Sequence, residues 1–138
     1  MEKKELARLA LNARKHAYAP YSNFLVGAAI LAANGKVYEA CNVENASYGL
    51  TICAERAATL KAVYDGTGQF KAIAIAGYPA SVEKNTDSFA FPCGACRQVL
   101  REFAAKDMKV YVVANEDNIK EYTLEELLPH SFGPDNLS

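Results

Sequence analysis

Two short cysteine-containing segments place the strongest constraint on how this chain can fold. Cys53-Ala54-Glu55 comes first, and Pro92-Cys93-Gly94-Ala95-Cys96 follows much later in the sequence. Each segment opens a helix-forming run, where free amide groups and the positive end of the helix dipole favour thiolate over thiol. Cys93 and Cys96 lie one helical turn apart, so both sulfurs can face one point that Cys53 reaches from a neighbouring helix. The sequence therefore predicts two helices that begin side by side.

Three thiolates with a carboxylate next to the first are the pattern of a hydrolytic zinc site. Cys53, Cys93 and Cys96 would fill three of the four tetrahedral positions of zinc and leave one open for water, whereas a structural site is normally closed by a fourth protein ligand. A buried trio of small residues or a redox Cys-x-x-Cys pair would explain the second segment alone. The two segments together favour zinc.

Charged residues beside these cysteines suggest further roles. Glu55 cannot point in the same direction as Cys53 from one helix, so we expect it beside the open position rather than on the metal. A carboxylate there can carry a proton from water to a ring nitrogen and then to departing ammonia. Three thiolates leave excess negative charge, which Arg56 and Arg97 could reduce through hydrogen bonds to sulfur, with Arg56 favoured. Either arginine could instead be a solvated ion-pair partner.

Length and charge narrow the class of protein. The chain has 138 residues, which suits one domain spanning residues 1–138. Fifteen basic and sixteen acidic residues nearly balance, and the basic ones are scattered, which argues against a nucleic-acid partner. The N-terminus begins an amphipathic pattern rather than a signal peptide, and no apolar run approaches the about 18 residues of a membrane span. We expect a cytoplasmic protein without membrane contact, where cysteines bind metal more often than they form disulfides.

Hydrophobic periodicity predicts alternating helices and strands. Helical spacing covers residues 3–18 and stops before Pro20, and an apolar strand over 24–33 turns at Asn34-Gly35 into an antiparallel strand over 36–43. A helix then runs from Cys53 to Asp65-Gly66. The remaining expected elements are a strand over 70–76, a helix over 94–105, a strand over 109–114, an extended piece over 119–123 and a helical turn over 124–128. Helical crossovers imply parallel strands, so we expect an α/β fold, a three-layer α/β/α sandwich with a mixed five-stranded sheet.

Several segments together resemble a known family. The two cysteine segments extend to Arg56 and Gln98, and further similar stretches cover residues 21–29, 42–49 and 127–134. Over nearly its whole length the chain resembles the small homotetrameric cytidine deaminases. The resemblance implies one zinc ion per subunit on Cys53, Cys93 and Cys96, and proton transfer by Glu55. It also implies hydrolysis of cytidine and deoxycytidine to uridine and deoxyuridine with release of ammonia, in pyrimidine salvage.

The same resemblance suggests how a nucleoside is bound. Asn42 and Glu44 lie two residues apart in an extended segment, so both can face one side and contact sugar hydroxyls, as the family implies. Phe24 is similar to the aromatic residue that packs on the pyrimidine. Further contacts are expected across subunit interfaces of a homotetramer with shared active sites: Ala46, Tyr48 and Phe132.

Competing functions share parts of this pattern. A deaminase of another cytosine nucleoside, such as a blasticidin-type antibiotic, would use the same metal chemistry, although the tail around Phe132 is more similar to the nucleoside enzymes. Nucleotide and polynucleotide deaminases typically have histidine as the first ligand and a cationic surface. A non-catalytic module in which zinc only joins two helices stays open. His16 and His130 lack partners at metal spacing, and Cys41 is expected to be a buried free thiol.

Overall fold

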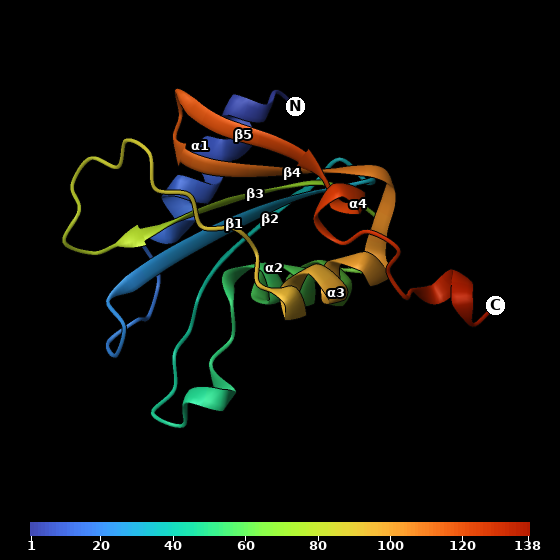
Figure 1. Cartoon of the computed structure of the whole chain (residues 1–138), viewed down its shortest axis with the longest axis horizontal. Helices are drawn as coiled ribbons and strands as arrows, with labels where there is room; N and C mark the ends of the chain where they lie inside the picture. The colour runs from blue at the N-terminus through green and yellow to red at the C-terminus, as the bar shows by residue number, and fades with distance from the viewer.

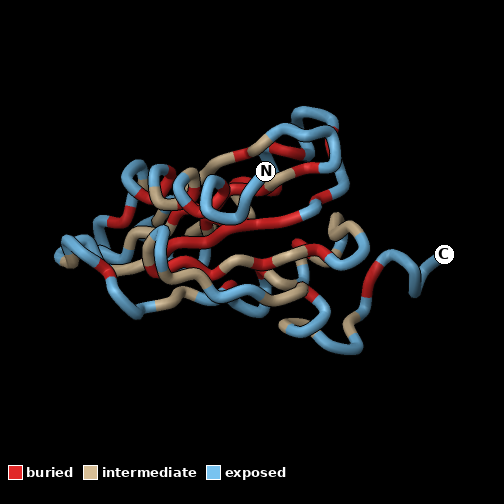
Figure 2. Tube along the Cα trace, turned by 90° about the horizontal axis from the view of Figure 1, so that it is seen from above, coloured by how far each residue is buried: buried red, intermediate tan, exposed pale blue.

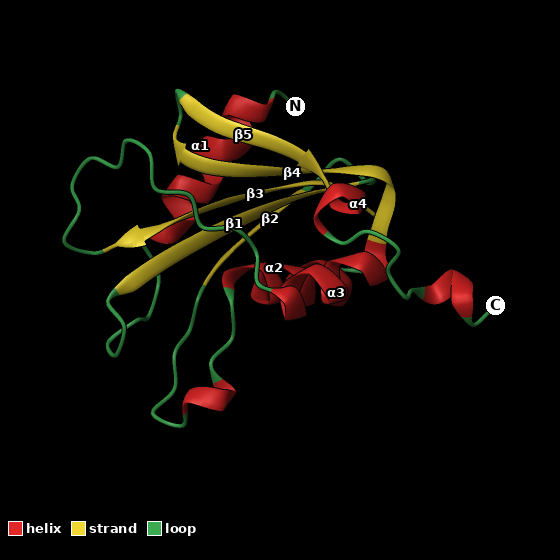
Figure 3. Ribbon diagram, in the orientation of Figure 1, coloured by secondary structure: helices red, strands yellow, loops and turns green.

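A mixed five-stranded sheet forms the centre of the computed structural model, which describes residues 1–138 (Figure 3). The strand order is β2-β1-β3-β4-β5. β3 and β4 are parallel, and every other neighbouring pair is antiparallel. The strands are Phe24–Ala32 (β1), Val37–Cys41 (β2), Phe70–Pro79 (β3), Ala104–Asn115 (β4) and Asn118–Thr123 (β5). The predicted mixed sheet and its Asn34-Gly35 hairpin are confirmed.

Helices cover both faces of the sheet (Figure 1). α1 (Lys3–Arg14) lies on one face, while α2 (Ala54–Tyr64) and α3 (Gly94–Phe103) lie side by side on the other. The short α4 (Leu124–Leu127) packs against β4 and β5, and 3-10 turns span Tyr48–Leu50 and Pro134–Asn136. The expected three-layer α/β/α sandwich is therefore confirmed. No helix combines the length and hydrophobicity that crossing a bilayer requires.

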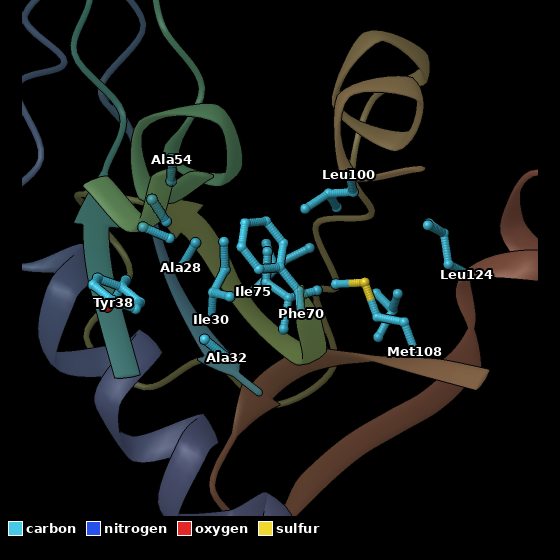
Figure 4. Packing of buried hydrophobic residues seen from close by; sticks show 14 of the residues in the cluster. Ala28, Ile30, Ala32, Tyr38, Ala54, Phe70, Ile75, Leu100, Met108 and Leu124 are labelled. Carbon is cyan, nitrogen blue, oxygen red and sulfur yellow. The ribbon is translucent and has the colours of Figure 1, made fainter. Parts of the chain in front are cut away.

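Two clusters of buried residues lie on either side of the sheet, and its three central strands, β1, β3 and β4, contain long buried stretches (Figure 2). The larger cluster joins the sheet to α2 and α3 and includes Phe70, Ile75 and Leu100 (Figure 4). From α2 it receives Ala54, Ala58 and Ala62, all completely buried. These short side chains let α2 lie close to the sheet, which fixes the position of Cys53 at its start.

On the other face of the sheet, α1 packs even more closely against β1. A Cβ atom on Gly27 of β1 would lie 2.1 Å from the carbonyl oxygen of Ala10 and 2.2 Å from the amide nitrogen of Arg14. The backbone of α1 therefore rests directly on the backbone of β1, which only glycine permits. Arg14 adds hydrogen bonds from its guanidinium to the carbonyls of Leu25 and Tyr78, so the end of α1 holds the starting end of β1.

Three predicted boundaries were wrong. The first helix ends at Arg14 rather than at residue 18, because Tyr18 instead exchanges main-chain hydrogen bonds with Asn42 and Glu44. For the same reason the second strand ends at Cys41, and Val43 only forms isolated bridges. β4 begins at Ala104, directly after α3, and not at residue 109. Its first residues are partly polar and pair irregularly with β3, so they show no regular alternation of apolar and polar side chains.

Candidate active site

The three predicted ligand cysteines meet at the starts of α2 and α3. Cys53 is the N-cap of α2, Cys93 is the N-cap of α3, and Cys96 lies in the first turn of α3. Their sulfur atoms all lie within 4.8 Å of one another, and those of Cys93 and Cys96 are 3.4 Å apart. All three are free thiols. Neither helix has a side-chain cap, so the first amide groups of each helix have no side-chain partner next to the cysteines.

This donor set fits zinc. Zinc–sulfur bonds of about 2.3 Å place the sulfurs of a tetrahedral site about 3.8 Å apart, close to the spacing found here. The hydrogen bond from Cys96, the largest effect, and then Arg56 lower the pKa of Cys53 to about 5, while the same bond raises the pKa of Cys96. The lowered pKa favours the thiolate form of Cys53, which is the form that a metal binds.

Glu55 is the buried acid of the site. Only 5% of its surface is exposed, and burial raises the pKa of its carboxyl group to about 7, with the negative charge of Cys53 acting in the same direction. A group with that pKa can both accept and return a proton near neutral pH. Glu55 lies in the first turn of α2, two residues after Cys53, so it is next to the cysteine cluster. It is not one of the residues that make up that cluster.

The two arginines differ in their partners. The Nη2 atom of Arg56 lies 3.6 Å from the sulfur of Cys53 and 3.4 Å from the carbonyl oxygen of Thr51. Arg97 instead donates to the carbonyl oxygens of Pro92 and Leu127, both at 2.7 Å. Arg97 therefore holds the chain that leads into Cys93 but makes no hydrogen bond to sulfur, whereas Arg56 does.

A pocket of about 190 Å³ opens beside the cysteines. It brings together Phe24 at the start of β1, Asn42 after β2, and Glu55. The other lining residues are Val26, Thr51, Cys53, Ala54, Ile75, Ala90, Phe91 and Cys93. A small, mostly apolar cavity with one buried acid and one amide beside the cysteines suits a small aromatic ring with polar edges.

A second pocket of about 350 Å³ adjoins the first, because Thr51 lines both. Glu44 and Tyr48 lie there, and the Tyr48 ring packs against Tyr21 with centroids 5.8 Å apart. The Glu44 carboxylate accepts hydrogen bonds from the hydroxyl and amide of Ser22 and from the amide of Tyr21, which lower its pKa. Glu44 therefore offers a fixed anionic acceptor next to the metal pocket.

Comparison with known proteins identifies the family. A model described as the cytidine and deoxycytidylate deaminase zinc-binding region matches residues 1–113. Curated cytidine deaminases of Sporosarcina psychrophila and Halalkalibacterium halodurans are each 44% identical to the whole chain, which covers 96% and 99% of those proteins. This chain belongs to the cytidine deaminase family.

Solved structures agree with this family membership. The crystal structure of a cytidine deaminase from Burkholderia pseudomallei has 43% sequence identity and a TM-score of 0.84, covering 96% of this chain and 100% of that one. That of Mycobacterium tuberculosis has 38% identity and a TM-score of 0.77, covering 96% and 98%. The α/β sandwich predicted from the sequence is thus the fold of this deaminase family. The family model describes a zinc-binding region, and the cluster of Cys53, Cys93 and Cys96 is positioned to bind that metal.

Other predicted residues lie outside the two pockets of this deaminase chain. Ala46 is exposed on the loop between β2 and α2, and Phe132 is 58% exposed on the C-terminal segment. His16 and His130 are exposed and far from any metal cluster. Cys41 is likewise outside the cysteine cluster, but it is half-buried rather than buried, and burial raises the pKa of its thiol.

Among the pocket residues of this deaminase chain that the sequence did not indicate are Thr51 and Phe91. Each lies two positions before an N-cap cysteine, in a segment that is extended where it enters the helix. In extended chain, side chains at i and i+2 point to the same side. That rule, applied backwards from Cys53 and Cys93, would have identified both residues.

Proposed function

We propose that this protein is a zinc-dependent deaminase that hydrolyses cytidine and deoxycytidine to uridine and deoxyuridine with release of ammonia, in pyrimidine salvage in the cytoplasm. Residues 1–138 would form one catalytic domain. The observation that most strongly supports this function is the position of the buried acid Glu55 in one pocket with Cys53 and Cys93. A zinc site that only joins two helices does not require a buried acid with a raised pKa, whereas proton transfer does.

Cys53, Cys93 and Cys96 would hold the zinc ion. When bound in such a site, zinc activates water and acts as a Lewis acid. Glu55 would take one proton from water and give it to the ring nitrogen next to C4 as the water oxygen bonds to C4. It would then take the second proton from that oxygen and give it to the amino group, which leaves as ammonia when the C4–N bond breaks. One water molecule is consumed and one ammonia is released, so Glu55 ends each cycle in its starting state.

The adjoining pockets divide the substrate between them. Phe24 would pack on the pyrimidine ring in the metal pocket, because aromatic rings favour stacked or edge contacts. Asn42, which lines the same pocket, would contact a sugar hydroxyl. Glu44 would accept hydrogen bonds from sugar hydroxyls in the second pocket. Tyr48, which also lines that pocket, would supply its contact across a subunit interface. Arg56 would withdraw charge from the sulfur of Cys53, while Arg97 would fix the backbone before Cys93.

The proposal includes a homotetramer with shared active sites. Large apolar side chains are exposed on the outer side of α2 and on the loop before it: Tyr48, Leu50, Leu60, Val63 and Tyr64, the last being 96% exposed. Such a concentration is typical of subunit interfaces. Ala46 and Phe132, which line neither pocket of their own chain, would contribute to a neighbouring site. Light scattering during size-exclusion chromatography measures the number of subunits.

Ammonia release from cytidine tests the function directly. The wild-type protein should deaminate cytidine, and a strong zinc chelator should stop the reaction. Glu55→Gln should retain zinc and the fold while turnover falls by about 10²–10⁴-fold, which is the usual contribution of a general acid–base group. Glu102→Gln is the matched control, since Glu102 is an exposed acid on α3. Near-normal turnover by Glu55→Gln would remove Glu55 from the mechanism, and no turnover by the wild type would reject the function.

A further inference from the structure

The helix that carries Cys96 also holds the C-terminal tail, defined here as residues 129–138. Gln98 donates a hydrogen bond from Nε2 to the carbonyl oxygen of Phe132 at 2.9 Å. One turn later, Arg101 donates from Nε to the hydroxyl of Ser131 at 2.9 Å and from Nη2 to the carboxylate of Asp135 at 2.6 Å. These two side chains of α3 therefore grip the tail on both sides of Phe132.

Gly133 makes this grip possible. A Cβ atom at Gly133 would lie 2.4 Å from the Cζ atom of Arg101 and 2.5 Å from its Nη1. The guanidinium occupies the space that any other side chain would need, and Gly133 is the buried point of the tail. Because its backbone is extended, with φ of −156°, this requirement is one of space and not of backbone conformation.

The grip fixes the backbone of the tail but leaves the Phe132 ring free. The carbonyl group of Phe132 is bonded to Gln98, while its side chain remains 58% exposed. The tail extends away from the sheet beyond α3 and α4 (Figure 1), and most of its residues are exposed. A segment with so few anchors would sample many conformations without Arg101.

We propose that Arg101 and Gln98 are positioning residues that present the Phe132 ring to the pocket of a neighbouring copy of this chain. The inference rests on the proposed function, in which Phe132 completes a neighbouring site. When the backbone of the tail is already fixed, the Phe132 ring can reach that site without a prior ordering of the tail. Loss of the grip lowers the fraction of tails in the competent conformation and weakens apparent substrate binding by that fraction.

Four variants test this role in steady-state deamination of cytidine. Arg101→Ala should raise KM about tenfold with kcat within about twofold, since the metal and Glu55 of the same chain are untouched. Gly133→Ala should act in the same direction, because the new methyl group displaces the flexible end of Arg101 without removing it. Gln98→Ala removes one hydrogen bond and should give a smaller rise. Glu102→Ala, on the same helix but without an ion pair, is the control and should leave KM unchanged.

Mixing subunits separates positioning from simple damage to α3. Glu55→Gln subunits have a dead site but an intact tail, and Arg101→Ala subunits have the reverse. After dissociation and reassembly at equal ratio, about a quarter of all sites should combine a working Glu55 with an intact neighbouring tail and recover wild-type KM, if each site borrows one tail. Damage confined to the site of the Arg101→Ala subunit itself would give no such recovery.

A second mixture distinguishes the possible failures. Phe132→Ala with Glu55→Gln should recover wild-type KM in the same way, since the intact tail again comes from the neighbour. Recovery in this mixture without recovery for Arg101→Ala would overturn the positioning role and leave the shared site standing. No recovery in either mixture would overturn the shared site and the positioning role with it. Unchanged KM in Arg101→Ala alone would also overturn the positioning role.

Discussion

Replacing Arg56 by alanine removes the one cation that contacts a sulfur of the metal cluster. Its Nη2 atom is 3.6 Å from the sulfur of Cys53. At an effective dielectric constant of 20, two unit charges at that distance interact by about 4.6 kcal/mol, which is an upper bound because Arg56 is only half-buried. A hydrogen bond to a charged group contributes about 1.5–3 kcal/mol. We therefore expect zinc affinity to fall by about 10–100-fold, within the range for residues that support metal ligands.

The assay is a zinc competition titration against a chromogenic chelator, followed by deamination kinetics at saturating zinc. Arg56→Ala should still bind zinc when the metal is in excess, and its kcat should fall because excess negative charge weakens activation of water. Arg56→Gln keeps much of the side chain without the charge and should resemble Arg56→Ala, whereas Arg56→Lys should recover part of the affinity. Equal zinc affinity and equal kcat in all four proteins would refute the role of this charge.

Three further changes give expected outcomes from single contacts. Gly27→Ala should lower the free energy of unfolding by about 3 kcal/mol or more in urea titrations, because the added methyl group meets backbone atoms of α1 that cannot move aside as a flexible side chain can. Gly49→Ala, where a Cβ atom meets nothing within 4 Å, should change it by less than about 0.5 kcal/mol. Removal of zinc should lower the melting temperature and readdition should restore it, since bound metal stabilises the folded state. Phe91→Ala should raise KM for cytidine more than it changes kcat, and unchanged kinetics would place Phe91 outside the substrate pocket.

The cysteine cluster could be predicted because short stretches of sequence mark the positions of its three cysteines. Each cysteine lies at a helix start, and helix starts are marked by short-range patterns that need no knowledge of the fold. The Asn34-Gly35 hairpin is local in the same sense, since two residues determine the turn. In contrast, the end of α1 depends on main-chain pairing of Tyr18 with residues after β2, which no pattern around Tyr18 reveals.

The roles of the arginines show the same limit. Arg56 and Arg97 both follow a ligand cysteine in sequence, and from sequence both could bond to sulfur. Arg97 instead bonds to the carbonyl of Leu127, a partner 30 positions away that only the packing of α4 brings close. Arg101 finds the tail in a similar way, through Ser131 and Asp135. The hydrogen-bond partners of Arg97 and Arg101 lie in distant segments of the chain, so the sequence around each arginine could not predict them.

Asn42 combines hydrogen bonds to β1 with unused hydrogen-bonding groups at the metal pocket. After β2 ends at Cys41, the amide of Asn42 continues the pairing with β1: its Oδ1 accepts from the amide of Val26, and its Nδ2 donates to the carbonyl of Phe24, both at 2.9 Å. One amide hydrogen and one lone pair remain for a ligand. The same side chain thus sets the position of Phe24 and offers a polar edge to the pocket. Because the two hydrogen bonds to β1 use only half of the capacity of this amide, a substrate that bonds to the other half would leave the pairing with β1 intact.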